Sequence, residues 1–333
     1  MNSRILALIG GLALLAGTSL VGQATKTKGA IPRTPDGHPD FQGVWTNATL
    51  TPMERPAVFN GKATVSDAEG RAYEQSDLKT NDIDRDDAPI LKAINGDNAV
   101  AGYNNLFIDR GSELARVDGV KRTSLIIDPP EGKVPPLTPE GRVRLAALFG
   151  GGDKYENVKQ RPLSERCIIG FGWTSGPPMV PALYNSNYQI VETRDTIMIL
   201  VEMVHDVRRI RMNAEHLPKT VLQFMGDSVG HWEGDTLVVD TTNFRTENAF
   251  RGATESLHVV ERFQRVDQNT ILYRAIIEDP ATFTRPFTME YPFLASPGPI
   301  YEYACHEGNY AMPDIMGGAR KMDAEGRENI SRH

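Results

Sequence analysis

From residue 184 onward, the chain consists of short runs rich in β-branched and aromatic residues, and turn signals separate these runs. The runs cover residues 188–192, 196–203, 207–212, 228–232, 236–242, 257–266, 271–278, 284–293 and 300–305. This spacing is typical of consecutive antiparallel strands, and a meander of this length closes into a barrel without leaving an edge. We therefore expect a mainly β protein in which residues 184–310 form an antiparallel up-and-down barrel.

Alternation along these runs predicts which side chains share a face of the sheet. One apolar row contains Ile271, Tyr273, Ala275 and Ile277, and another contains Arg285, Phe287, Met289, Tyr291 and Phe293. Glu261 shares a face with Leu257, Val259, Phe263 and Arg265, so this face mixes apolar with charged residues. A barrel built this way has either a wet outer face or a polar-lined interior, and the pattern alone leaves both open.

The region before the barrel, residues 25–183, is rich in proline, glycine, aspartate and asparagine. We expect it to be mostly loops that pack on the barrel. Ser66, with Glu69 three residues later, predicts a helix through Tyr73. A second helix is expected over 138–148, before three glycines. The acidic stretch 81–87 is interpreted as a surface loop, and residues 311–333 as a C-terminal tail.

The first residues predict export. Arg4 precedes an apolar stretch over 5–16, and small and polar residues follow up to Ala24, which is the order of a secretory signal peptide. The stretch is too short to span a bilayer, so we expect cleavage after residue 24, no stable membrane insertion and a periplasmic or secreted protein. The formal charge of −7 and the scattered basic residues argue against a nucleic-acid partner.

The two cysteines, Cys167 and Cys305, are interpreted as one disulfide, because an exported chain matures in an oxidising compartment. The alternative is that Cys305 is a nucleophilic thiol beside His306. A thiol would place a reactive group at the end of the last predicted strand, and a disulfide would place a rigid cross-link there.

The densest group of polar residues falls where one predicted strand ends and the next begins. Its expected catalytic members are His205, as acid or base, with Asp206 or Glu202 as the orienting carboxylate. Arg208 and Arg209 are the expected anion clamp, and Glu261 is placed with them as a substrate contact. A charged hairpin tip that merely faces solvent is the alternative.

A second group follows Cys305. His306 and Glu307 are further catalytic candidates, and Tyr303 and Asn309 are candidate substrate contacts. The alternative is structural, with Glu307 and Asn309 bonding backbone groups. His231 and Glu233 are two residues apart, but residues 233–235 are interpreted as a tight turn, and His38, His216 and His258 as ordinary loop or strand histidines. The histidine spacing predicts no metal site, and the absence of nucleotide-binding motifs predicts no cofactor.

Several stretches together resemble a large family of exported bacterial proteins without an assigned activity. The matching stretches are 34–45, 166–167, 202–209, 230–241, 261–262 and 301–309. The resemblance covers nearly the whole mature chain and implies export and a lipocalin-like β-barrel. It supplies no reaction and no site residue.

Three functions are compatible with these features. The first is an enzyme that acts on a small apolar or aromatic molecule by cofactor-independent acid–base chemistry, as a lyase, decarboxylase, isomerase or hydrolase. The second is a periplasmic binding protein that holds an apolar ligand in the barrel. The third is an envelope or glycan-binding module, in which Trp45, Trp173 and Trp232 are sugar platforms. The sequence leaves the oligomeric state open.

Overall fold

The computed structural model describes residues 30–82, 84, 105–150, 157–170, 173–248 and 250–326. The predicted leader, residues 1–24, lies outside these ranges, and so does most of the predicted loop 81–87. Within the ranges, none of the helices combines the length and the apolar character that a membrane span requires.

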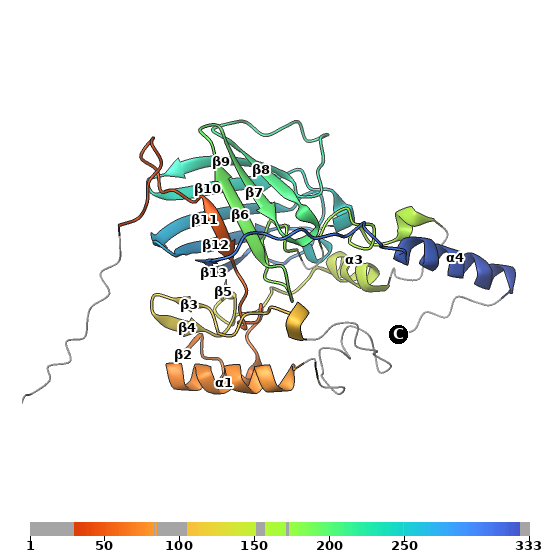
Figure 1. Ribbon diagram of the computed structural model, residues 1–333, viewed down its shortest axis with the longest axis horizontal. Helices are drawn as coiled ribbons and strands as arrows, with labels where there is room; N and C mark the ends of the chain where they lie inside the picture. The colour runs from red at the N-terminus through yellow and green to blue at the C-terminus, as the bar shows by residue number, and fades with distance from the viewer. Residues whose placement is uncertain are drawn as a thin grey trace, which may run out of the picture.

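The described residues form a mainly β structure around one closed barrel, which confirms the predicted fold class (Figure 1). The sheet order is β1-β6-β7-β8-β9-β10-β11-β12-β13, and β13 pairs with β1 to close the ring. The strands are β1 (Gly43–Thr46), β6 (Asn187–Glu192), β7 (Thr196–Val201), β8 (Val207–Met212), β9 (Asp227–Glu233), β10 (Thr236–Thr242), β11 (His258–Asp267), β12 (Thr270–Glu278) and β13 (Phe287–Ala295). A further strand, β5 (Ile126–Asp128), pairs with the other part of β13.

The barrel departs from the expected antiparallel meander at β8 and β9, which run parallel. A parallel pair needs a crossover connection rather than a hairpin, and residues 213–226 provide it. The expected barrel of residues 184–310 also lacked one strand, because β1 comes from the N-terminal region. The run 300–305 forms no strand. Its Tyr301 N–H donates instead to the Glu202 side chain, at 3.1 Å.

Inward-facing side chains fill the barrel. The predicted apolar rows of β12 and β13 are buried inside the barrel, and aromatic rings of these two neighbouring strands contact one another there. Met179 enters from outside the strands. Its backbone N–H and C=O bond to the hydroxyls of Tyr273 and Tyr291, at 3.1 and 2.6 Å. The barrel therefore has a packed aromatic core where a lipocalin-like binder would need an open interior.

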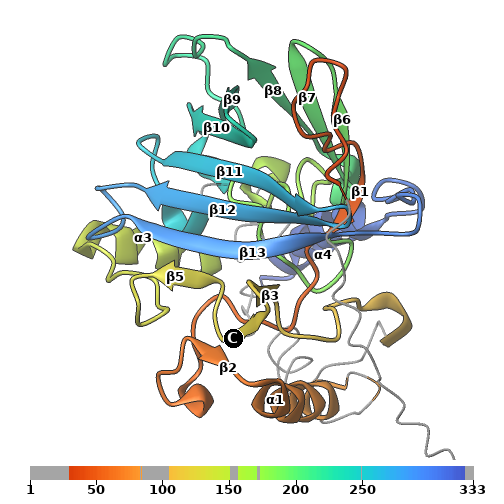
Figure 2. The ribbon, with the colours of Figure 1, turned by 90° about the vertical axis from the view of Figure 1, so that its left-hand side faces the viewer.

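The remaining elements lie outside the barrel. Figure 2 shows β11, β12 and β13 side by side, with β5 and then α1 (Asp67–Thr80) beyond them. The predicted cap of α1 is present, since Ser66 and Glu69 bond reciprocally in a capping box. A small sheet, β2 (Thr64–Val65), β4 (Val120–Arg122) and β3 (Arg116–Val117), lies near α1. The other helices are α3 (Pro139–Gly150) and α4 (Ala311–Ala324), and α4 occupies part of the predicted tail. Short 3-10 turns cover 57–59, 105–107, 158–160, 203–205, 246–248 and 250–252.

Candidate functional site

The predicted cluster around His205 does not gather into one site. Glu202 is buried and accepts hydrogen bonds from the Asn187 side chain, at 2.6 Å, and from Tyr301 N–H. His205 is exposed, with a φ of +50°. Asp206 instead faces another loop and accepts from Gly170 N–H, at 2.9 Å, and from the Ser175 hydroxyl. Burial raises the pKa of the Asp206 carboxyl. Glu202 and Asp206 thus bond separate segments and do not orient the imidazole.

Arg208 and Glu261 meet inside the barrel as a buried ion pair. The Arg208 guanidinium donates to both Glu261 oxygens, at 2.9 and 2.7 Å, and the Tyr273 hydroxyl donates to one of them, at 2.9 Å. Both charged side chains are at most 1 % exposed. Arg209 follows on the opposite, outer face of β8 and is exposed. The predicted pair of arginines is therefore split between the two faces of the barrel wall.

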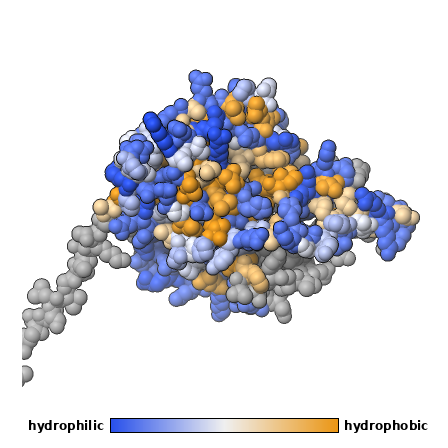
Figure 3. Space-filling model, turned by 45° about the horizontal axis from the view of Figure 1, so that its top comes forward, coloured by the Kyte–Doolittle hydropathy of each residue, from blue (hydrophilic) through white to orange (hydrophobic). Residues whose placement is uncertain are grey.

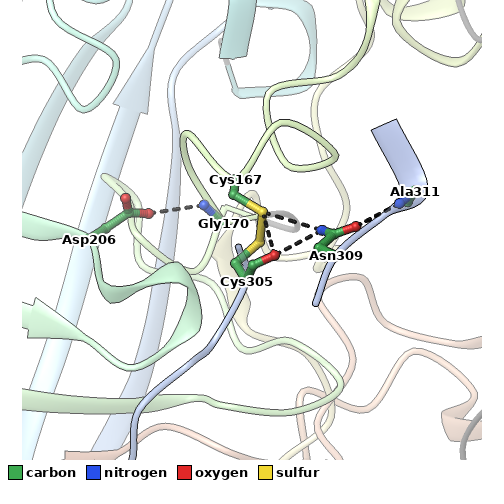
Figure 4. Close-up of a disulfide and its surroundings, with 6 residues drawn as sticks. All are labelled: Cys167, Gly170, Asp206, Cys305, Asn309 and Ala311. Atoms are coloured by element: carbon green, nitrogen blue, oxygen red, sulfur yellow. Dashed lines mark hydrogen bonds between the residues drawn. A yellow bond between two sulfur atoms is a disulfide. The ribbon is translucent and has the colours of Figure 1, made fainter. Parts of the chain in front are cut away.

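The second predicted group surrounds the disulfide between Cys167 and Cys305, which confirms the predicted pairing (Figure 4). A disulfide sulfur is not a free thiol, so Cys305 is no nucleophile in this state. The Asn309 side-chain amide donates to the Cys305 carbonyl, at 2.8 Å, and its oxygen accepts from Ala311 N–H. Asn309 thus takes the structural role that was the alternative, while His306 and Glu307 are exposed.

The two predicted groups are linked by backbone contacts and not by a shared pocket. Figure 4 shows Asp206 bonded to Gly170, on the loop that carries Cys167. Tyr303 lines a groove of about 640 Å³ with Glu307 and Asn309, and no residue of 202–209 lines that groove. The contacts of Asp206 and of Tyr303 therefore do not bring the two predicted groups into one site.

A different pocket lies at the end of the barrel covered by the N-terminal segment, drawn in red in Figure 1. We call it the mouth pocket. It has a volume of about 340 Å³ and lies where the β6–β7 and β9–β10 hairpins face residues 34–42. Its lining residues are Thr34, Pro35, Asp36, His38, Gln42, Glu192, Thr193, Arg194, Ile197, Met212 and Trp232.

Aromatic stacking holds the N-terminal segment in place over this pocket. The His38 ring stacks on Trp232 with centroids 4.4 Å apart and an interplanar angle of 3°. Phe41 is buried and stacks on the same indole, at 5.7 Å. Arg33 and Asp235 form a two-bond ion pair at the surface, at 2.8 and 2.7 Å. The N-terminal segment and Trp232 therefore together form part of the wall of the mouth pocket.

Glu192 is the titratable group with the most unusual environment in the mouth pocket. One carboxylate oxygen accepts from Phe41 N–H, at 3.1 Å. The other oxygen, Oε1, is buried without a hydrogen-bond partner among the described residues. Burial raises the pKa of Glu192 to about 7, and the nearby negative charges of Asp40 and Asp36 add to the effect. A carboxyl group with this pKa can give or take a proton near neutral pH.

Sequence reasoning missed Glu192 because it precedes the turn at Arg194 and Asp195 and carries no motif of its own. The only sequence signal for Glu192 was its place in the alternating row of β6. Tyr188 and Ile190 alternate inward along β6, and Glu192 continues that row as its single charged member. The stretch 34–45 stood out only through the family resemblance, and His38 was interpreted as an ordinary loop residue.

Other predicted features hold a structural place. The turn after β9 is confirmed, since Gly234 has a φ of +59° between β9 and β10. His258 bonds Asp240, at 2.9 Å, and this hydrogen bond raises the pKa of the imidazole. In the ranges that the structure describes, no three histidine, cysteine, aspartate or glutamate side chains gather as metal ligands would. No family model, curated protein or solved structure matches the chain.

Proposed function

We propose that this protein is an enzyme that binds a small apolar or aromatic molecule in the mouth pocket, where Glu192 transfers a proton. The observation that carries the proposal is that Glu192 lines the mouth pocket while its Oε1 is buried without a hydrogen-bond partner among the described residues. A strongly perturbed carboxyl group in a cleft is a recognised mark of a functional site. The expected acid–base chemistry is retained, and Glu192 takes the role first assigned to His205.

The walls of the mouth pocket favour an apolar or aromatic substrate. Ile197, Met212 and the Trp232 indole provide hydrophobic surface, and the pocket volume falls within the usual range for small-molecule sites. Arg194 adds one cationic group among the lining residues, which suits a substrate that develops negative charge.

The chemistry proposed for Glu192 needs no cofactor. Its ionised form can remove a proton from a carbon next to a carbonyl group, and its protonated form can return one. Such a step belongs to isomerase, lyase and decarboxylase reactions, and positioned general acid–base groups contribute about 10²- to 10⁴-fold in rate. The pKa of about 7 keeps both forms populated at neutral pH.

The first experiment measures the pKa of Glu192 by carbon NMR with carboxyl-labelled glutamate, and Glu192→Gln assigns the signal. We expect a midpoint near 7. A midpoint near the ordinary value of about 4.3 would contradict the proposal.

The second experiment follows exchange of carbon-bound protons for deuterium in acetophenone, phenylpyruvate and 2-indanone. We expect protein-catalysed exchange, with a loss of about 100-fold or more in Glu192→Gln. Glu278→Gln, which changes an exposed glutamate on β12, is the matched control and should keep the wild-type rate. Equal rates for Glu192→Gln and wild type would remove Glu192 from the mechanism.

Binding without turnover is the second candidate, and it has the same pocket. The apolar walls favour it, since they need no reaction to hold a ligand. Quenching of tryptophan fluorescence by 1-naphthol, with no exchange in any probe, is the outcome that would support it. The glycan-binding hypothesis loses one platform, because Trp45 is only 2 % exposed.

Export from the cytoplasm is part of the proposal. It is supported by the predicted leader, residues 1–24, and by the bond between Cys167 and Cys305, since disulfides persist in oxidising compartments. Amino-terminal sequencing of the protein from the periplasm tests it, and a protein that begins at Met1 would contradict cleavage.

A further inference from the structure

The barrel wall has a window between β8 and β9. These two strands pair only from Ile210 and Ser228 onward, so the start of β8 has no partner strand on that side. The crossover 213–226 and Arg245 border this part of the wall, and a pocket of about 530 Å³ lies among them. We call it the window pocket. It includes Val207 at the start of β8, whereas the mouth pocket includes Met212 at the end.

Cationic groups dominate the window pocket. Among the described residues, four arginines line it, at positions 208, 209, 211 and 245, against a single carboxylate, Asp227. That carboxylate is already occupied by Arg211 and by Leu217 N–H. Arg245 pairs with Glu247. Arg209 is exposed, and its guanidinium has no carboxylate partner in the described part of the chain.

Arg208 supplies a buried donor in the same pocket. Its two terminal nitrogens are used by Glu261, but its Nε lies buried without an acceptor among the described residues. Arg208 thus lines the pocket from the inner face of the barrel wall, with its charge already paired with Glu261. The pocket offers one exposed guanidinium, Arg209, that has no carboxylate partner among the described residues.

The rest of the lining is largely apolar, with Gln223 and Ser228 as its uncharged polar members. Leu217, Leu222, Phe224 and Met225 come from the crossover, and Val207 is 49 % exposed beside them. Figure 3 brings the top of the molecule forward and shows apolar patches bordered by hydrophilic residues. An unpaired guanidinium next to an apolar surface fits a ligand with an anionic head and a hydrocarbon body.

We infer that the window pocket binds an aliphatic carboxylate, whose head bonds Arg209 and whose chain lies against the crossover. Guanidinium groups bind carboxylates through strong, charge-assisted hydrogen bonds. This site is separate from the mouth pocket and stands whether or not Glu192 is catalytic.

The test is calorimetric binding of octanoate to the whole mature protein, with octan-1-ol as the uncharged probe of equal chain length. We expect octanoate to bind at least tenfold more tightly than octan-1-ol, since a hydrogen bond to a charged group is lost with the carboxylate. Equal affinities, or no octanoate binding, would overturn the inference.

Two pairs of variants locate the site. Arg209→Gln should weaken octanoate binding about tenfold or more, whereas Arg285→Gln, an exposed arginine on the loop before β13, should leave it unchanged. Val207→Asp should abolish binding by placing a negative charge in the pocket. Val207→Asn, whose side chain has the shape of aspartate without its charge, should retain binding. Identical affinities within either pair would overturn the assignment.

Glu192→Gln separates this inference from the proposed function. Octanoate affinity should be unchanged in that variant, because Glu192 lies in the mouth pocket. Loss of octanoate binding in Glu192→Gln would indicate that octanoate binds in the mouth pocket. That result would overturn the window assignment and leave the proton-transfer proposal in place.

Discussion

Glu261 and Glu192 both lie on inward-facing rows of the same barrel, yet their surroundings are opposite. Glu261 is fully buried and accepts two bonds from Arg208 and one from Tyr273. Glu192 is half-buried, and among the described residues only Phe41 N–H bonds its carboxylate. The positive charge of Arg208 compensates the negative charge of Glu261. Burial, in contrast, disfavours the ionised form of Glu192.

The comparison separates a structural carboxylate from a reactive one. Burial alone marks neither role, since Glu261 is the more buried of the two. The difference lies in whether a partner compensates the charge, because an uncompensated carboxyl group shifts its pKa. A group with a shifted pKa at the edge of a pocket can exchange protons with a ligand, and a group enclosed by its partners cannot.

The largest expected effect comes from breaking the buried pair. Arg208→Met leaves Glu261 charged and unpaired inside the barrel, and we expect a loss of about 3–5 kcal/mol in the free energy of unfolding. Urea denaturation measures it, with Arg209→Met on the outer face of β8 as the control. The double variant Arg208→Met with Glu261→Leu should recover most of the loss. A single variant as stable as the control would show that the pair is not needed.

The second effect concerns Glu192 and depends on pH. The folded carboxyl has a pKa of about 7, against 4.5 for an unperturbed glutamate. Between these two values the folded chain holds a proton that the unfolded chain has lost, so wild-type stability falls as pH rises from about 4.5 to 7. The pKa difference of about 2.5 corresponds to at most about 3 kcal/mol, and partial exposure reduces it.

Glu192→Gln removes this penalty. We therefore expect the variant to be about 1–2 kcal/mol more stable than wild type at pH 8, and the advantage to shrink toward pH 4.5. Urea denaturation at pH 4.5, 6 and 8 measures it, with Glu278→Gln as the control. An advantage that is the same at all three values would mean that the folded and unfolded chains titrate alike.

The smallest effect concerns the cover of the mouth pocket. The Arg33–Asp235 pair is exposed on both sides, at 46 % and 53 %, and solvent and salt weaken such pairs. We expect Arg33→Gln to leave the urea midpoint and the NMR pKa of Glu192 unchanged, because Phe41 and Trp232 hold the segment. A pKa of Glu192 that falls toward its ordinary value would show instead that the ion pair keeps the cover closed.

Much of the barrel could be predicted from the sequence. Most strand runs after residue 184 fall within a few residues of the observed strands, because alternation and turn residues are local signals. The parallel β8–β9 pair could not be predicted in this way, since strand direction depends on where residues 213–226 lead the chain. The early strand β1 was missed because its four residues show no run of their own.

The candidate site was less predictable than the fold. Chemical type singled out His205 and His306, but both are exposed in the structure. Arg208 and Glu261 were expected as substrate contacts, and the structure places them against each other as a buried ion pair. Glu192 was overlooked because its raised pKa comes from burial and from the charge of Asp40, which lies about 150 residues away in the chain.

The sequence by itself determined the strand pattern, the inward rows, the capped helix at Ser66 and the pairing partners available to its two cysteines. These depend on neighbouring residues, or on there being only two of a kind. The tertiary structure alone decided which carboxylate is paired, which donor is left without an acceptor and where the pockets lie. Desolvation and hydrogen bonding depend on what surrounds a group in space, and distant parts of the chain supply those surroundings.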